Sequence, residues 1–263
     1  MTSTYQTILI EIDDRGIATM TLNRPEKHNA MSSEMMAEIR HAIATIHADN
    51  SIRAVVLTGA GRSFCAGADL GWMKANFDRN RQERIAESEV LGAMLDEMNR
   101  LNKPLIAKVN GQAYAGGIGM ISVCDIAIGV PDAMFSVTEV RLGLTPANIS
   151  PYLIARMGIS NARRTFLNAH FFKGEEAVTL GLLNKVVDAE QLQQAVDNEI
   201  KELLSCAPEA VAITKELIRY VTSHQPEDVR LHTSALLADC WEGEEAQSGI
   251  QAFFEKKPAP WIN

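Results

Sequence analysis

The chain has 263 residues, of which 46% are hydrophobic and 22% charged, and its formal net charge is −8 at pH 7. This composition is typical of a globular protein, and the length allows one large α/β core or a core with a helical appendage. The negative charge argues against nucleic acid as a main partner, because binding phosphates requires clustered cations.

The first elements predicted along the chain are a hairpin and a helix. Residues 8–12 and 17–22 have strand-like patterns, and the turn at 13–16 between them favours a hairpin. Ser32 or Ser33 can cap a helix that runs to about residue 48.

Strand and helix patterns then alternate through about the first 190 residues. This alternation predicts a mainly parallel sheet with right-handed crossovers. In chain order the pattern predicts a strand over 54–57, a helix over 81–101, a strand over 104–109, a short helix over 117–123 and short strands over 125–130 and 134–137.

The pattern changes after Pro151, where helical periods dominate and are interrupted at Pro208, Pro226 and Gly243. We therefore expect a sheet-bearing core over residues 1–190 and a helical region over 191–263. The apolar and aromatic positions of this helical tail predict that it packs on a neighbouring element or on a partner subunit.

Several classes of site have no signal in the sequence. The four cysteines form no C-x-x-C pair and the six histidines have no metal-ligand spacing, so we expect no metal site and no disulfide framework. The first six residues do not resemble a signal peptide, and no 18-residue apolar run predicts a membrane span. These features together predict reduced thiols and a cytoplasmic location.

Two short segments rich in small residues carry the chemistry suggested by the residues themselves. The segment 64–69 follows the apolar run 54–57, and the segment 115–119 follows the apolar run 104–109. Small side chains let a ligand approach the main chain, so two such turns side by side can direct N–H groups at the oxyanion formed when a thioester becomes an enolate. Tight packing between strand and helix is the alternative explanation for the glycines.

Seven landmark segments stand in a characteristic order and spacing, namely 23–25, 28–31, 63–70, 110–111, 115–117, 124–127 and 135–143. By this order and spacing the chain resembles the crotonase superfamily, the enoyl-CoA hydratase/isomerase family. More particular segments resemble the branch that hydrates branched glutaconyl-CoA esters in leucine or acyclic terpene breakdown, namely 67–73, 136–144 and 149–151.

The resemblance implies a fold, a site and an assembly. The fold is a spiral of repeated ββα units followed by C-terminal helices that form homotrimers or homohexamers. The thioester carbonyl lies between the N–H groups of Ala68 and Gly116, and Glu139 is the acid/base. Burial beside an acyl chain would raise the pKa of this carboxyl, which suits proton transfer near neutral pH.

Gly119 departs from the pattern of hydratases with two carboxylates, which carry Glu at that position. Glu139 alone would have to serve both as base for the water and as acid for the α-carbon, or another group would assist it. We expect the missing side chain to leave space for a branched or carboxylated acyl group.

The resemblance also implies contacts with coenzyme A, which enters as part of the substrate, so no separate cofactor is expected. The adenine is expected against the main chain of Ala66, Asp69 and Leu70, although Asp69 can simply cap the next turn. The other residues expected to contact coenzyme A are Lys27, Phe253 and Lys256, and those expected near the acyl group are Trp72, Met73, Tyr114, Gly119 and Asn148. Each of these has an ordinary structural explanation as well.

Three functions are consistent with these residues. The first is hydration of a 3-methylglutaconyl-like thioester by Glu139, and the second is isomerisation of an enoyl-CoA by the same carboxyl. The third is a non-catalytic acyl-CoA-binding protein, which would have less reason to keep Glu139.

Overall fold

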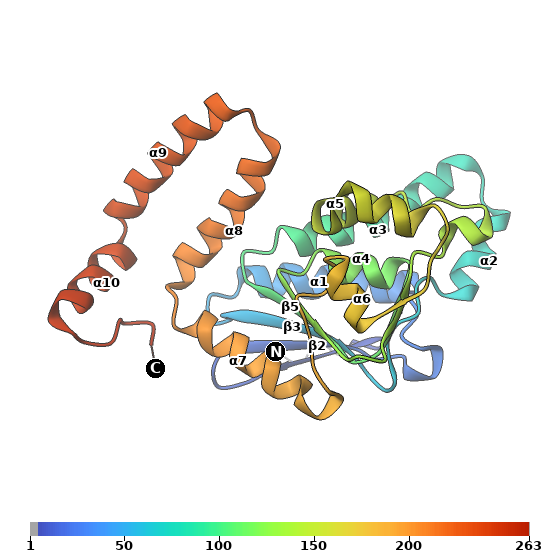
Figure 1. Cartoon of the computed structure of the whole chain (residues 1–263), viewed down its shortest axis with the longest axis horizontal. Coiled ribbons are helices and arrows are strands. Elements are labelled where there is room, and N and C mark those ends of the chain that lie inside the picture. Colours follow the sequence, from blue (N-terminus) through green and yellow to red (C-terminus); the bar gives the residue numbers. More distant parts are fainter. Residues whose placement is uncertain (1–4, 263) are drawn as a thin grey trace. The chain divides into compact units, whose positions relative to one another are not determined.

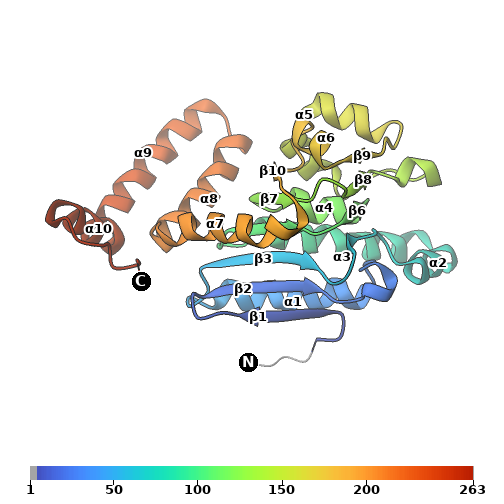
Figure 2. The same cartoon turned by 60° about the horizontal axis from the view of Figure 1, so that its bottom comes forward.

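A computed structural model describes residues 5–262, so the first four residues, on which the expectation about a signal peptide partly rests, lie outside the described residues. The chain divides into two compact units. One comprises the residues up to Leu101 together with Leu105–Val196, and the other comprises Asn102–Pro104 and the residues from Asp197 onward. Figures 1 and 2 show the elements of both units.

The first sheet of the larger unit has six strands in the order β1-β2-β3-β5-β7-β10. β1 and β2 form the antiparallel hairpin expected from the sequence, and the remaining neighbours pair in parallel. All six residues of β3 are buried, as expected for a central parallel strand. The strands are β1 (Ile8–Ile12), β2 (Ile17–Leu22), β3 (Ala54–Gly59), β5 (Leu105–Val109), β7 (Ile126–Gly129) and β10 (Lys185–Val186).

A second sheet has four strands in the order β4-β6-β8-β9. They are β4 (Ser63–Cys65), β6 (Gln112–Tyr114), β8 (Met134–Ser136) and β9 (Phe172–Lys173). The chain passes from the first sheet to the second three times, from β3 to β4, from β5 to β6 and from β7 to β8, and a helix follows each passage. This repetition is the spiral of ββα units implied by the resemblance, and the expected fold is confirmed.

The helices of the larger unit begin at recognisable caps. The Ser32 hydroxyl accepts the N–H of Met35 at 3.2 Å, so Ser32 rather than Ser33 caps the first long helix. Asn80 and Glu83 form a capping box on the next long helix. The helices are η1 (Pro25–Lys27), α1 (Ser33–Ala48), α2 (Leu70–Asp78), α3 (Arg81–Asn99), α4 (Gly116–Ser122), η2 (Glu139–Leu142), α5 (Ser150–Phe166), α6 (Gly174–Thr179), η3 (Ala189–Gln191) and α7 (Leu192–Leu204), which continues past the division between the units.

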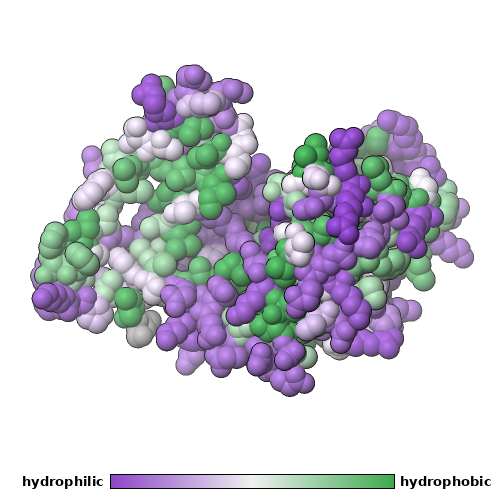
Figure 3. All heavy atoms as spheres, in the orientation of Figure 1, coloured by the Kyte–Doolittle hydropathy of each residue, from purple (hydrophilic) through white to green (hydrophobic). Residues whose placement is uncertain are grey.

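The smaller unit contains α8 (Pro208–Ser223), α9 (Pro226–Glu242) and α10 (Glu244–Glu255). The helices begin or end at the proline and glycine positions expected from the sequence, since proline is tolerated in the first turn. Figure 3 shows hydrophobic surface over these helices. The large exposed apolar side chains include Ile218, Leu231, Leu237, Trp241, Phe253 and Phe254.

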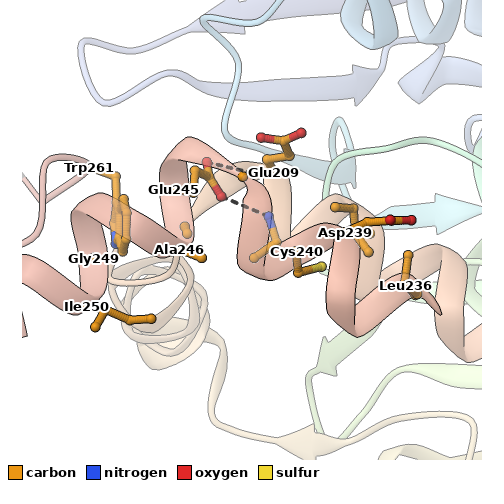
Figure 4. A pocket seen from close by; sticks show the side chains of 13 residues that line it. Glu209, Leu236, Asp239, Cys240, Glu245, Ala246, Gly249, Ile250 and Trp261 are labelled. Carbon is orange, nitrogen blue, oxygen red and sulfur yellow. Dashed lines mark hydrogen bonds between the residues drawn. The ribbon is translucent and has the colours of Figure 1, made fainter. Parts of the chain in front are cut away.

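A hollow of about 430 Å³ lies among α8, α9, α10 and Trp261 in this smaller unit. Figure 4 shows the Glu245 carboxylate of α10 at the start of α8, where it accepts the N–H groups of Glu209 at 2.9 Å and Ala210 at 3.0 Å. A carboxylate at a helix N-terminus satisfies otherwise unpaired donors and favours the helix dipole. No residue that we assign to the chemistry lines this hollow.

None of the described helices combines the length and the apolar character needed to cross a membrane.

Gly92 in α3 predicts a simple gain in stability. An added Cβ would meet no heavy atom of the described residues within 4 Å beyond its own helix backbone and chain neighbours. We expect Gly92→Ala to raise the free energy of unfolding by about 0.8–1.0 kcal/mol, the helix-propensity difference, with unchanged activity. Urea unfolding measures this. Gly174→Ala is the contrast and should lose stability, because its Cβ would lie 2.6 Å from the carbonyl oxygen of Val130. A loss of stability in Gly92→Ala would contradict the open space at that position.

Candidate active site

Three segments leave the second sheet at the same edge. β4 pairs in parallel with β6, and β6 pairs in parallel with β8. Because the carboxyl ends of parallel strands meet at one edge of a sheet, the turns that contain Ala68 and Gly116 and the segment that contains Glu139 all begin there. The three residues expected to carry the chemistry therefore start from one edge, although they are far apart in the sequence.

The two small-residue turns pack against each other. Gly67 has a φ of +92°, and a Cβ there would lie 3.1 Å from the Tyr114 carbonyl oxygen and 3.3 Å from the Ala115 Cβ. A Cβ on Gly117 would lie 2.4 Å from the Cys65 carbonyl oxygen. Glycine is required at both positions because the backbones approach so closely.

The N–H of Ala68 points away from Met31, the residue with which Ala68 pairs. Met31 donates its N–H to Gly67 at 2.8 Å and accepts the N–H of Asp69 at 2.9 Å, forming an isolated parallel bridge with Ala68. Successive N–H groups of an extended segment point to opposite sides, so the Ala68 N–H faces the other way. No acceptor for it occurs among the described residues.

The N–H of Gly116 lies in the first turn of α4, where backbone donors have no carbonyl four residues earlier to bond. The first bond of this helix runs from Gly119 to the Ala115 carbonyl at 3.1 Å. Ala115 itself has φ 48° and ψ −118°, a conformation that a non-glycine residue rarely adopts. Its own N–H bonds Ser136 at 3.1 Å, which ties the strained turn to the end of β8. Such local strain often occurs at functional sites.

Glu139 begins η2, three residues beyond the end of β8, and is half-buried. Its Oε2 is buried and has no hydrogen-bond partner among the described residues. Burial raises the pKa of the Glu139 carboxyl, and a bond from its own backbone N–H offsets only part of this effect. An unpartnered carboxyl oxygen with a raised pKa is suited to exchanging a proton with a ligand.

Gly119 does not offer the space that we expected from the sequence. It is buried in α4, and an added Cβ would lie 2.4 Å from Cγ2 of Ile149 and 3.6 Å from Cδ1 of Leu95. The side chain of Ile149, which is 2% exposed, occupies the room that a missing side chain would have left. The expectation that an acyl branch enters there is therefore wrong.

This packing predicts the effect of adding a methyl group at Gly119. We expect Gly119→Ala to lower the free energy of unfolding by about 1–3 kcal/mol, the usual cost of overpacking a core. The double variant with Ile149→Ala should lose less stability than the sum of the two single losses, because the two sites share one contact. Urea unfolding of the two single variants and the double variant checks this. Additive losses would show that Ile149 does not set the limit.

Comparisons with known proteins identify the family to which this chain belongs. A model of the enoyl-CoA hydratase/isomerase family matches residues 13–263. A short-chain-enoyl-CoA hydratase from Clostridium acetobutylicum is 34% identical over 244 residues, which cover 92% of this chain and 92% of that protein. The chain belongs to the enoyl-CoA hydratase/isomerase family. The resemblance to the crotonase superfamily is thereby confirmed, and with it the expectation of an enzyme of the enoyl-CoA hydratase type.

Two further members of the enoyl-CoA hydratase/isomerase family match nearly the whole length of this chain. A mevalonyl-coenzyme A hydratase from Aspergillus fumigatus is 32% identical over 264 residues, covering 98% of this chain and 96% of that protein. The crystal structure of an enoyl-CoA hydratase from Shewanella pealeana matches with a TM-score of 0.94 at 32% identity and covers 98% of this chain and 97% of its own.

Asp69 caps α2 in this enoyl-CoA hydratase/isomerase family protein. Its carboxylate accepts the N–H groups of Gly71 at 2.8 Å and Trp72 at 3.2 Å and pairs with the Arg24 guanidinium at 3.0 Å. Burial acts to raise the pKa of this carboxyl, but these bonds outweigh burial, and the pKa lies below its ordinary value. The capping role considered from the sequence is confirmed.

The indole of Trp72 is held in place by a carboxylate that the sequence did not single out. The Trp72 Nε1 donates to Glu87 Oε2 at 2.9 Å, and the other oxygen of Glu87 pairs with Arg79 at 2.9 Å. These bonds join α2 to α3. Trp72 and Met73 are both half-buried, and their contact with an acyl group stays a prediction.

The polar candidates near the site already have partners within the protein. The Asn148 amide donates to the Ser88 hydroxyl at 2.8 Å and thereby ties the segment before α5 to α3. The Tyr114 hydroxyl donates to Gln112 at 3.2 Å and lines a hollow of about 510 Å³. Arg141, a further polar side chain near the site in η2, donates to the Ala169 carbonyl at 3.0 Å. These bonds give each side chain a structural role.

The residues expected to contact coenzyme A lie in both units. Lys27 at the end of η1 and Leu70 at the start of α2 are exposed, whereas Ala66 donates its N–H to the His28 carbonyl at 2.9 Å. The other two candidates, Phe253 in α10 and Lys256 just after it, belong to the smaller unit and are exposed. Their contacts with coenzyme A stay predictions.

Proposed function

We propose that the protein adds water across the double bond of an α,β-unsaturated acyl-CoA thioester. One observation carries this proposal. The Glu139 carboxyl has a buried oxygen without a hydrogen-bond partner among the described residues, and its segment leaves the second sheet at the same edge as the turns of Ala68 and Gly116. Coenzyme A arrives as part of the substrate, and the proposed chemistry uses no resident metal or redox cofactor.

In the proposed reaction the thioester oxygen accepts the N–H groups of Ala68 and Gly116. The Glu139 carboxylate takes a proton from water while the water oxygen bonds to the β-carbon, and the electron pair of the double bond moves toward the thioester oxygen. The enolate so formed then takes the proton from the Glu139 carboxyl at its α-carbon. Two preorganised donors stabilise the developing negative charge, and each is worth about 3–4 kcal/mol of the barrier.

For the acyl group we propose a methyl-branched enoyl chain of the 3-methylglutaconyl kind. The segments around Trp72 and Val140 support this through their resemblance to hydratases of branched glutaconyl esters. The relative that is named a mevalonyl-coenzyme A hydratase adds support, since the mevalonyl group carries a methyl branch. Because Ile149 fills the space beside Gly119, we expect the branch to lie against other residues of the site.

Isomerisation is the second candidate, and one observation favours it. Position 119 is a glycine, and Ile149 occupies the space beside it, so no second carboxyl assists Glu139 from that place. Moving a double bond needs only one group that removes and returns a proton.

A panel of enoyl-CoA thioesters, with and without a methyl branch and a terminal carboxylate, tests the proposal. We expect the absorbance of the conjugated enoyl thioester to fall and a product heavier by one water to form. This reaction should be fastest with the thioesters that carry both a methyl branch and a terminal carboxylate. A product of unchanged mass with a moved double bond would establish isomerisation instead. Tight binding of every thioester without conversion would contradict both reactions.

We also propose that the protein works as a homotrimer or homohexamer. The exposed apolar side chains of α8, α9 and α10 support this, because monomers rarely expose so many large apolar groups in one region. Sedimentation velocity measures the state, and a monomer at micromolar concentration would contradict this part of the proposal.

A further inference from the structure

Met31 contacts both of the turns whose amides are proposed to bind the thioester oxygen. Its backbone makes the two hydrogen bonds that flank Ala68, one to the Gly67 carbonyl at 2.8 Å and one from the Asp69 N–H at 2.9 Å. Its side chain reaches the other turn, since a Cβ on Gly116 would lie 2.1 Å from the Met31 Cε. The residue is 3% exposed, so its methyl group is enclosed there.

The backbone of Met31 is itself fixed from its N-terminal side. The Arg24 guanidinium donates to the Ala30 carbonyl at 2.7 Å and also pairs with Asp69 at 3.0 Å. Asn29 is fully buried with φ 55°, and its side-chain amide donates to two backbone carbonyls. The methyl of Met31 therefore extends from a rigid support and not from a loose loop.

We propose that Met31 is a positioning residue that sets the separation between the N–H groups of Ala68 and Gly116. The proposal rests on the proposed function, since it concerns the same pair of amides. Its backbone holds one amide, and its side-chain length determines how closely the other can approach. Two donors must converge on one oxygen, and a misplacement of about 1 Å can cost about 100-fold in rate.

A series of side chains at position 31 tests this role. We expect Met31→Ala to lower kcat by about 10-fold or more, a fraction of the effect of losing one donor, while KM changes little. Met31→Leu keeps most of the volume but lacks the terminal methyl group, so its kcat should lie between those of the wild type and Met31→Ala. Met98→Ala is the matched control, because Met98 is fully buried near the end of α3 and its loss should leave kcat unchanged.

A spectroscopic measurement separates positioning from a general loss of packing. Crotonyl-CoA labelled with ¹³C at the carbonyl is bound to Glu139→Gln, in which turnover is expected to be slow, and its carbonyl stretch is recorded. Two hydrogen bonds lower this frequency. Adding Met31→Ala should move the band back toward its value in solution, and adding Met98→Ala should not.

Restoring the lost volume from the opposite side completes the test. Gly116→Ala places a methyl group where the Met31 methyl lies, so the double variant Met31→Ala/Gly116→Ala should be more active than the two single losses predict. If Met31→Ala does not fold, Met31→Leu and its carbonyl band decide.

The outcomes distinguish the two proposals. A wild-type band and wild-type kcat in the position 31 variants would overturn the role of Met31 and leave the proposed function intact. A carbonyl band in Glu139→Gln that equals the band in solution would instead contradict the pair of amides itself.

Discussion

Replacing Glu139 by Gln is expected to lower turnover by at least about 100-fold, the low end of general acid–base contributions, with little change in thioester binding. The same variant should be more stable than the wild type at neutral pH. Burial raises the pKa of this carboxyl, so the folded state favours its protonated form. The stability contributed by that preference is complete below the unfolded pKa and is lost as the pH rises through the folded pKa.

The stability difference between Glu139→Gln and the wild type should therefore be small near pH 4 and larger near pH 7. Urea unfolding at the two pH values measures it, and initial rates give the loss of turnover. Glu89→Gln is the control, because Glu89 is an exposed carboxylate of α3 and should change neither quantity. A Glu139→Gln variant with near wild-type turnover would end the case for this residue as the acid/base.

Gly117→Ala is expected to damage both the turn and the reaction. Its Cβ would lie 2.4 Å from the carbonyl oxygen and 3.0 Å from the Cβ of Cys65, and backbone atoms cannot move aside as a flexible side chain can. The turn that carries Gly116 must shift away from β4. We expect a loss of about 100-fold or more in kcat, comparable to losing one donor, and a stability loss of about 1–3 kcal/mol.

Gly116→Ala is the internal comparison for this prediction. The atom nearest to its added Cβ is the terminal methyl of Met31, which ends a side chain and is not part of the backbone, so its losses should be smaller than those of Gly117→Ala. Steady-state kinetics and urea unfolding of the two variants provide the comparison. Equal effects would show that the turn tolerates or rejects any side chain alike.

The sequence predicted the parts of this structure that depend on local chemistry. Proline and glycine positions marked the ends of the C-terminal helices, and small residues after apolar strands marked the two turns. These signals lie within a few residues of the features that they produce. The resemblance added the spiral arrangement and the position of Glu139, which spacing alone does not provide.

Other features depend on contacts that a single sequence does not reveal. β4 and β6 have three residues each, which is too few for an alternating pattern. Most of β4 was therefore interpreted as part of the first small-residue turn, and β6 was not predicted. The helix α2 was missed because it has no buried residue and therefore no apolar stripe. The contact between Gly119 and Ile149 joins two separate elements, so an absent side chain was mistaken for free space.

The packing of Ile149 against Gly119 has a stereochemical consequence for the proposed hydration. A planar enoyl group presents two faces, and a carboxyl at Glu139 can reach only one of them in a given bound geometry. If that carboxyl both activates the water and returns the proton, oxygen and hydrogen join the same face of the double bond. Because Ile149 packs against Gly119 and no second carboxyl stands there, the addition would then be syn, and in deuterated water the two new stereocentres would have one fixed relative configuration.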